Sequence, residues 1–185
     1  MARTQATEYD ERKQAIVDAA AALFASDGFN GASVADIAKR GGISKALVYH
    51  YYESKEDILY DVMISHVRAL ENAAAEVTGD ASVPPAKRLR ELAHRFMALY
   101  VNAADRHKVL LNDLNRLPRA KRAEIVKVQR RLIETVQKLL VEIEPGLKRK
   151  SGASFAAAML FFGTINWTHT WFDPKGAVSA GELAE

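Results

Sequence analysis

Cysteine is absent from this sequence of 185 residues, which excludes disulfides and thiolate metal sites. No apolar run approaches the roughly 20 residues that a membrane-spanning helix needs. Residues 1–14 also lack the apolar stretch of a secretory signal. The five histidines show neither an HExxH pairing nor metal-ligand spacing. We therefore expect a cytoplasmic protein without a metal or another cofactor.

An overall excess of one charge is also missing. The formal net charge is only +3, and residues 87–150 hold 17 lysines and arginines against 7 aspartates and glutamates, whereas residues 1–60 hold 7 against 9. Global basicity therefore gives no argument for nucleic-acid binding, which has to rest on a local pattern. With 49% hydrophobic residues, the chain can bury the core of one domain or two small ones.

What the sequence does contain is helical periodicity. Strand-like alternation is absent, and proline and glycine fall at expected helix borders. The first expected helix, residues 11–26, carries one apolar stripe made of Ile16, Ala19, Ala20, Leu23 and Phe24. Further helices are expected over residues 34–40, 44–52, 54–77, from Pro84-Pro85 onward, and over 105–115, 118–143 and 151–172. These patterns predict an all-α fold.

Several residues mark the expected helix ends. Gly28 suits the left-handed position that terminates a helix, and Ser33 and Ser54 are expected to cap the helices that follow them. Near the end of the chain, Ser179–Glu182 forms a capping box. We expect a further helix to begin there, cut short by the end of the sequence at Glu185.

Residues 33–59, SVADIAKRGGISKALVYHYYESKEDIL, carry the most informative pattern. Two short expected helices are joined by Gly41-Gly42, which is the helix-turn-helix layout. Ala38 is small enough for the helices to cross closely, and their shared core is supplied by Ile37, Ile43 and Val48. The second helix has aromatic and basic residues on its outer face, as expected of a recognition helix in the major groove.

This stretch closely resembles the signature of the TetR family of transcription regulators. The shared features are an Ile-Ala pair, a Gly, an Ile-Ser pair, a Tyr followed by aromatic residues, then Ser-Lys-Glu and Ile-Leu, and the detailed match covers residues 12–60. The resemblance implies a three-helix helix-turn-helix domain over residues 1–55 and a long fourth helix, about 55–77, as a bridge. Residues 78–185 would then form a helical domain for ligand binding and dimerisation.

The resemblance also implies which residues contact DNA. Tyr49 matches the signature tyrosine and is expected to contact a backbone phosphate, while Lys55 is expected to grip another. The residues expected to face or flank the groove are Ser33, Ser44, Lys45, Ala46, Leu47, His50 and Tyr51. Tyr49, Tyr51 and Tyr52 also fit a role as core aromatics. Ala46, Leu47 and Tyr52 depart from the commonest family residues, which leaves the operator sequence open.

The segment AAAMLFFGTINWTHTWF is apolar on nearly every face. Such a helix must be buried by its own fold or by a partner. The resemblance implies that it forms, with residues 118–143, a four-helix bundle with a second copy of the chain, and a two-fold contact also matches a palindromic operator. Asn166 and Trp167 place polar groups in this helix, as parts of the packing or of a pocket wall.

The tail NWTHTWFDPKGAVSAGELAE looks like that of family members that control the degradation of fatty acids, steroids or aromatic acids, which often sense acyl-coenzyme A thioesters. The arginines of residues 87–150 would bind the phosphates of such an effector, unless they only form a solvated face. The acyl chain would need an apolar tunnel, for which the candidate residues are Phe96, Leu99, Tyr100, Leu110, Leu114, Asn166 and Trp167.

We therefore expect a repressor that a small molecule, such as an acyl-coenzyme A, releases from its operator. The alternatives are a small helical acyl-coenzyme A binding enzyme and an interaction protein that does not bind DNA. No Ser-His-Asp arrangement, glycine-rich phosphate loop or carboxylate pair supports an enzyme, and an enzyme leaves residues 33–59 unexplained. We expect the protein not to be an enzyme.

Overall fold

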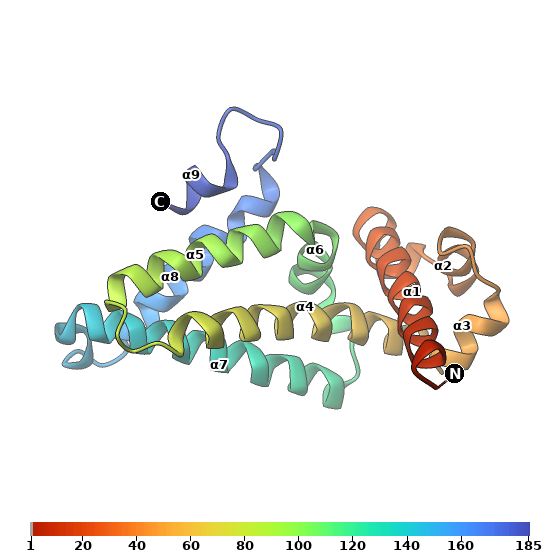
Figure 1. Ribbon diagram of the computed structural model, residues 1–185, viewed down its shortest axis with the longest axis horizontal. Helices are drawn as coiled ribbons and strands as arrows, with labels where there is room; N and C mark the ends of the chain where they lie inside the picture. The colour runs from red at the N-terminus through yellow and green to blue at the C-terminus, as the bar shows by residue number, and fades with distance from the viewer. Residues whose placement is uncertain (1) are drawn as a thin grey trace. The chain divides into compact units, whose positions relative to one another are not determined.

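The computed structural model describes residues 2–185, with side chains from residue 8 onward. This part of the chain is helical and contains no β-strand (Figure 1). The α-helices are α1 (Ala2–Gly31), α2 (Val34–Arg40), α3 (Lys45–Tyr51), α4 (Lys55–Thr78), α5 (Pro85–Asn102), α6 (Ala104–Asp113), α7 (Arg119–Ile143), α8 (Ala153–Trp167) and α9 (Ala180–Ala184). Short 3-10 helices are η1 (Leu114–Arg116), η2 (Pro145–Lys148) and η3 (Thr168–Thr170). The predicted all-α fold is confirmed.

The helices form two compact units, Met1–His66 with Asp105–Glu124, and Val67–Ala104 with Ile125–Glu185. The first unit differs from the expected division at residues 55 and 78, because it also takes in α6 and the first turns of α7. Hydrogen bonds between α6 and α1, and between α7 and α4, account for this. Among the described residues, no helix combines the length and apolar character needed to cross a bilayer.

Helix α1 is longer at both ends than the expected 11–26. Its predicted stripe is buried, with Ile16, Ala20 and Phe24 at most 2% exposed. Gly28 interrupts the helix with φ 74° and ψ 163°. This is not the left-handed helix end expected for Gly28, but a positive-φ extended conformation that is essentially restricted to glycine. The chain then completes one more turn before α2.

Helices α2 and α3 follow the prediction closely. Ser33 caps α2: its hydroxyl accepts from the backbone N–H of Asp36, and the Asp36 carboxylate accepts from the N–H of Ser33. The Asp36 carboxylate accepts hydrogen bonds from both the hydroxyl and the backbone N–H of Ser33, and these hold the pKa of the Asp36 carboxyl below its usual value. Helix α2 ends at Gly41, where an added Cβ would lie 3.3 Å from the carbonyl oxygen of Ile37 and 3.5 Å from that of Ala15. The turn residue thus lies closely against α1.

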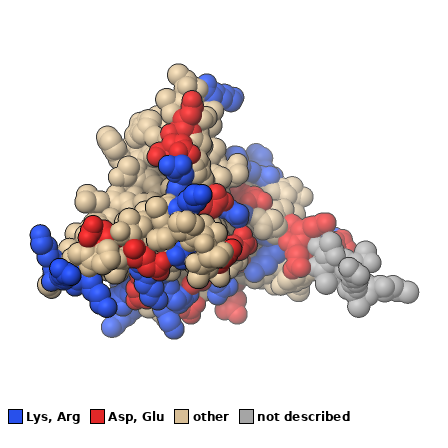
Figure 2. All heavy atoms as spheres, turned by 60° about the vertical axis from the view of Figure 1, so that its left-hand side comes forward, with Lys and Arg blue, Asp and Glu red and all other residues tan. Residues whose placement is uncertain are grey.

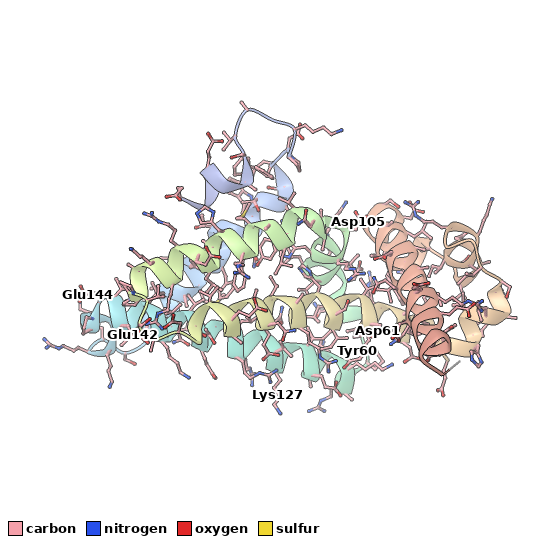
Figure 3. The ribbon with its side chains drawn as sticks, in the orientation of Figure 1. Tyr60, Asp61, Asp105, Lys127, Glu142 and Glu144 are labelled. Atoms are coloured by element: carbon pink, nitrogen blue, oxygen red, sulfur yellow. The ribbon has the colours of Figure 1, made fainter. Side chains whose placement is uncertain are left out.

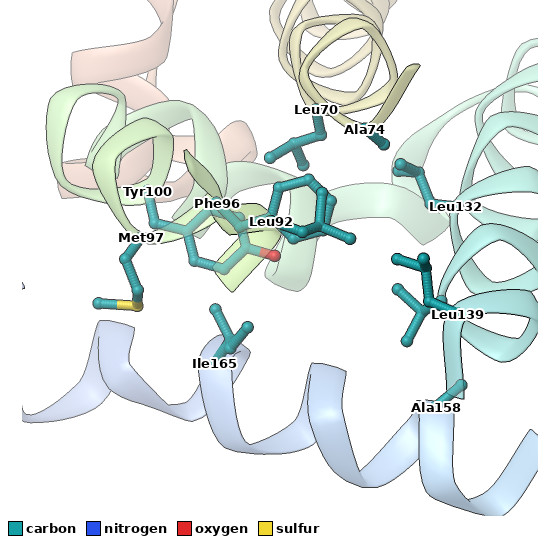
Figure 4. Packing of buried hydrophobic residues seen from close by; sticks show 11 residues of the cluster. Leu70, Ala74, Leu92, Phe96, Met97, Tyr100, Leu132, Leu139, Ala158 and Ile165 are labelled. Carbon is teal, nitrogen blue, oxygen red and sulfur yellow. The ribbon is translucent and has the colours of Figure 1, made fainter. Parts of the chain in front are cut away.

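The core of the second unit is drawn from α4, α5, α7 and α8 (Figure 4). Its buried members are Leu70, Ala74, Leu92, Phe96, Met97, Tyr100, Leu132, Val136, Leu139, Ala158 and Ile165. Helix α8 ends at Trp167 and continues as η3, so it is shorter than the expected 151–172. The predicted capping box starts α9, whose residues Ala180, Leu183 and Ala184 pack against this core.

Candidate DNA-binding interface

Helix α3 is anchored by one buried residue and exposes most of the rest. Val48 has no exposed surface, while Lys45, Ala46, Tyr49 and His50 are exposed. Half of Tyr49 is accessible, at 50%, and the ammonium of Lys45 lies 5.8 Å from the centre of its ring. Six of the nine predicted DNA-contacting residues are therefore exposed, namely Ser33, Ser44, Lys45, Ala46, Tyr49 and His50.

The two predicted serines shape the helices that carry this surface. The Ser44 hydroxyl accepts a hydrogen bond of 3.1 Å from the backbone N–H of Leu47, and the Ser33 hydroxyl accepts one of 3.2 Å from Asp36. Both serines are thus N-caps that fix where α3 and α2 begin. Leu47 is half-buried beside its cap. Groove contacts by these three residues stay predictions.

Tyr51 is half-buried, unlike the exposed Tyr49 and His50. Its ring centre lies 4.6 Å from that of Tyr9 on α1 and 5.5 Å from that of His50, which it meets edge to face. The contact with Tyr9 braces α3 against the first part of α1. Tyr9 was missed by the sequence reasoning, although an aromatic residue in an otherwise polar N-terminal segment was a signal for such a contact.

Tyr52 belongs to the core, and that alternative is confirmed by an exposed fraction of only 6%. Its hydroxyl donates to Asp61 Oδ2 over 2.7 Å, and the Lys13 ammonium pairs with the same oxygen at 2.7 Å. Burial, together with the hydrogen bond to Asp61, raises the pKa of Tyr52 far above its usual value. Asp61 on α4, labelled in Figure 3, thus joins α1 to the end of α3.

The predicted phosphate ligand Lys55 is turned toward the protein. Its ammonium donates to the carbonyl oxygens of Phe29, at 2.7 Å, and Ala32, at 2.9 Å. It also lies 4.2 Å from the centre of the Phe29 ring. Lys55 is half-buried, so the structure gives this side chain a contact that the sequence reasoning did not include.

Helices α6 and α7 contact the same unit through polar side chains. Arg106 of α6 pairs with Asp18 of α1 at 2.5 Å. At the start of α7, Lys121 pairs with Asp57 of α4, and Glu124 accepts a hydrogen bond from the hydroxyl of Tyr60, which Figure 3 labels on α4. These contacts connect α6 and α7 to the helices that support α3.

Helix α8 has two apolar faces. One packs into the core of the second unit through Ala158, Phe161, Phe162 and Ile165. The other is exposed, and its large members are Phe155 (51%), Met159 (43%), Leu160 (73%) and Trp167 (67%). The small residues Ala156 and Gly163 lie on the exposed side too. Both sides of α8 are therefore apolar, in agreement with the prediction from the sequence. We call the exposed side the α8 face.

The residues predicted to line an effector pocket belong to both compact units. Phe96 and Tyr100 lie in the core of the second unit, and Trp167 lies on the α8 face. Leu99 packs against the same core and also lines a groove of about 270 Å³ between α4 and α5, together with Asn72, Glu76, Arg95 and Asn102 among others. Leu110 and Leu114 belong to the first unit, so the predicted pocket stays a prediction.

A hydrogen bond between two polar side chains lies in the largely apolar core of the second unit. The Tyr100 hydroxyl donates to Asn166 Oδ1 over 2.9 Å, and burial raises the pKa of Tyr100 well above its usual value. The rings of Phe96 and Phe162 are stacked beside this pair, with centres 6.1 Å apart. Asn166, which the sequence marked as a polar residue in an apolar helix, is therefore paired from α5.

Taken together, an exposed α3 on a three-helix support and an all-helical body with an exposed apolar helix define a helix-turn-helix DNA-binding regulator. A family model described as "Bacterial regulatory proteins, tetR family" matches residues 16–62. A second, "Tetracyclin repressor-like, C-terminal domain", matches residues 82–185. The chain belongs to the TetR family.

Solved structures and curated relatives are consistent with membership of the TetR family. A TetR-family transcriptional regulator from Bordetella parapertussis 12822 is 35% identical, with a TM-score of 0.88 over 93% of this chain and 89% of that one. AibR, crystallised with isovaleryl coenzyme A and operator DNA, shares the fold at 24% identity, with a TM-score of 0.81 over 94% of each chain. The repressor DhaR of Mycobacterium sp. (strain GP1) is 26% identical over 70% of this chain, which spans 66% of that protein.

Proposed function

We propose that the protein is a transcription repressor that binds operator DNA as a homodimer and is released by a small molecule. In this proposal residues 1–55 bind DNA, α4 links them to the remainder, and residues 78–185 dimerise and bind the effector. The observation that carries it is the exposure of Lys45, Tyr49 and His50 on the short helix α3, whose residue Val48 is buried. An exposed short helix on a rigid support is what major-groove recognition requires.

The α8 face supports the dimer. Exposed apolar patches of this kind mark protein interaction sites, and the occupant we propose is the same face of a second copy. Ala156 and Gly163 would let the two helices approach each other closely. Charge supports a dimer as well, since residues 1–60 hold 7 lysines and arginines against 9 aspartates and glutamates; on the face of the protein shown in Figure 2, basic and acidic side chains are likewise intermixed. Few cations therefore act per protomer, and a second copy doubles the phosphate contacts.

Selection of bound fragments from a genomic library by the purified protein, followed by a gel-shift assay, tests DNA binding. Tyr49→Phe removes only the hydroxyl and Tyr49→Ala also removes the ring. We expect about tenfold weaker binding for Tyr49→Phe, as for the loss of one hydrogen bond to a charged group, and a larger loss for Tyr49→Ala. Retention of no fragment by the native dimer at low ionic strength would contradict the proposal.

For the effector, we propose an acyl-coenzyme A thioester. The basic excess in residues 87–150 supports an anionic ligand, because arginines bind phosphate well. The Tyr100–Asn166 pair among aromatic rings suits an apolar ligand with one polar group such as a thioester carbonyl. That AibR was crystallised with isovaleryl coenzyme A and operator DNA is consistent with a fold that accommodates both.

Thermal unfolding with coenzyme A, with acyl-coenzyme A thioesters of increasing chain length, and with the matching free acids tests this proposal. A ligand at about 100 times its Kd stabilises the native state by about 2.7 kcal/mol. An effector that prefers the DNA-free form by about 1–3 kcal/mol weakens operator binding roughly 5- to 150-fold. If no thioester stabilises the protein, the acyl-coenzyme A proposal is wrong, whereas the proposal of DNA binding is unaffected.

A further inference from the structure

We propose that Lys55 is a positioning residue that holds the helix-turn-helix in its DNA-binding geometry, and that it does not act mainly as a ligand for a DNA phosphate. This inference rests on the proposed DNA-binding function and concerns how the same surface is kept in shape.

The chemistry of the two helix ends explains why the ammonium lies where it does. Lys55 is the first residue of α4, and a cation is disfavoured at the N-terminus of a helix. Phe29 lies in the single turn of α1 beyond the interruption at Gly28, and Ala32 directly follows α1, where carbonyl groups lack partners within a helix. The side chain thus reaches from the unfavourable N-terminus of α4 to carbonyl oxygens that can accept its hydrogen bonds.

The contact also closes a long stretch of chain. Lys55 is separated by 26 residues from Phe29 and by 23 from Ala32, and α2 and α3 lie entirely between these points. The hydrogen bonds of the ammonium therefore connect the residues just before α2 to the residue that begins α4, just after α3. Phe29 and Ala32 are buried, at 7% and 3% exposed, so the carbonyls belong to a well-packed turn.

The donor count limits what else Lys55 can do. An ammonium has three N–H donors, and two are directed at carbonyl oxygens over 2.7 Å and 2.9 Å. The ring of Phe29 covers a further side at 4.2 Å. One donor at most remains for a phosphate. Lys45, in contrast, is exposed on α3 and provides a matched lysine on the DNA-binding face.

The salt dependence of operator binding separates the two roles. Removing a phosphate contact from each protomer of a dimer lowers the slope of log K against log salt by about 2, because fewer counterions are released. Removing a positioning contact lowers the competent fraction of the protein and hence the affinity, without changing the slope. We expect Lys55→Met to bind about tenfold more weakly with the native slope. Lys45→Met is the comparison for an exposed cation.

Hydrogen exchange of the DNA-free protein gives an independent measurement. The amides of Ile37, Leu47 and Val48, which are hydrogen-bonded in the first turns of α2 and α3, should exchange faster in Lys55→Met than in the native protein. This measurement tests the inference even if the native protein binds no operator. Failure of the proposed DNA-binding function can therefore be told apart from failure of the inference about Lys55. Native exchange, native affinity, or a slope reduced by about 2 in Lys55→Met would each overturn the inference.

Should Lys55→Met not fold, Lys55→Arg replaces it. Arginine retains the charge and is the better phosphate ligand, but its planar head group is a poor substitute for an ammonium held between two carbonyls and a ring. We expect faster exchange at the same amides and weaker binding. Native affinity together with native exchange in Lys55→Arg would overturn the positioning role.

Discussion

His66 of α4 and His107 of α6 meet in the interior of the first unit, with Nε2 of His66 3.2 Å from Nδ1 of His107. Both residues are only 2% exposed, and their rings lie edge to face at 5.3 Å. Arg106, which precedes His107, pairs with Asp18 and reaches the hydroxyl of Ser65. A buried imidazole pair thus joins α6 to α4.

This pair makes stability depend on pH. Burial, with a smaller contribution from the Arg106 charge, lowers the pKa of His66 to about 4. The unfolded chain therefore binds a proton between about pH 6.5 and pH 4 that the native protein does not. Native stability should fall as the pH drops through this window, by on the order of 3 kcal/mol in all.

Urea unfolding at several pH values between 4 and 7.5 measures this effect. His66→Gln, which keeps a polar side chain without the titration, should flatten the profile. His50→Gln, at an exposed position, is the control and should leave the profile unchanged. A His66→Gln profile as steep as the native one would show that other groups cause the loss of stability.

The α8 face predicts how the dimer can be broken. Leu160 is 73% exposed in one protomer, so Leu160→Glu should fold normally but place two carboxylates in an apolar contact. We expect the dimer dissociation constant to rise at least about 100-fold, equivalent to roughly 3 kcal/mol. Light scattering after gel filtration measures the mass. Lys87→Glu, at an exposed position of α5, is the charge control, and a dimeric Leu160→Glu protein would place the interface elsewhere.

The ion pair between Lys121 and Asp57 connects the start of α7 to the first turn of α4. Its side chains are 30% and 25% exposed, which places it between a surface pair and a buried one. In a double-mutant cycle of Lys121→Met and Asp57→Asn, we expect a coupling energy of about 1 kcal/mol in urea unfolding. A coupling near zero would mean that the pair contributes no net stability.

The hydrogen bond from Tyr100 to Asn166 predicts a cost for Tyr100→Phe. The substitution keeps the ring in the core but leaves the Asn166 oxygen without its donor, and about 1–2 kcal/mol of stability should be lost. Asn166→Ala should lose a similar amount, and the double variant should lose less than the sum. If the contact also holds the effector, Tyr100→Phe should reduce the stabilisation by an acyl-coenzyme A in the thermal assay.

The local sequence pattern predicted the helices well, whereas contacts between residues far apart in the sequence were harder to predict. The bounds of α2 agree with the expectation at both ends, because Ser33 and Gly41 carry their own backbone signals. The first turns of α1 were missed, since residues 2–10 contain no apolar stripe. Their contact with α3 depends on Tyr9 and Tyr51, which lie 42 positions apart in the sequence.

The same distinction applies to the candidate interface. The positions of Tyr49 and Lys55 in the motif identify both residues, but only Tyr49 is exposed as expected. The partners of Lys55 are the backbone carbonyls of Phe29 and Ala32. Every residue has a backbone carbonyl, so the sequence does not show which ones a side chain will bind. Spacing therefore indicates that a lysine belongs at position 55 without showing what it binds.

Gly28 has a consequence for anyone who wishes to engineer this protein. Replacing a glycine within a helix by alanine is a common way to raise thermal resistance, and an added methyl group at this position would touch nothing within 4 Å. The backbone torsion of φ 74° and ψ 163° nevertheless opposes every other L-residue. A library screened for more thermostable variants should therefore retain glycine at position 28, although the absence of nearby atoms suggests that a larger side chain would fit there.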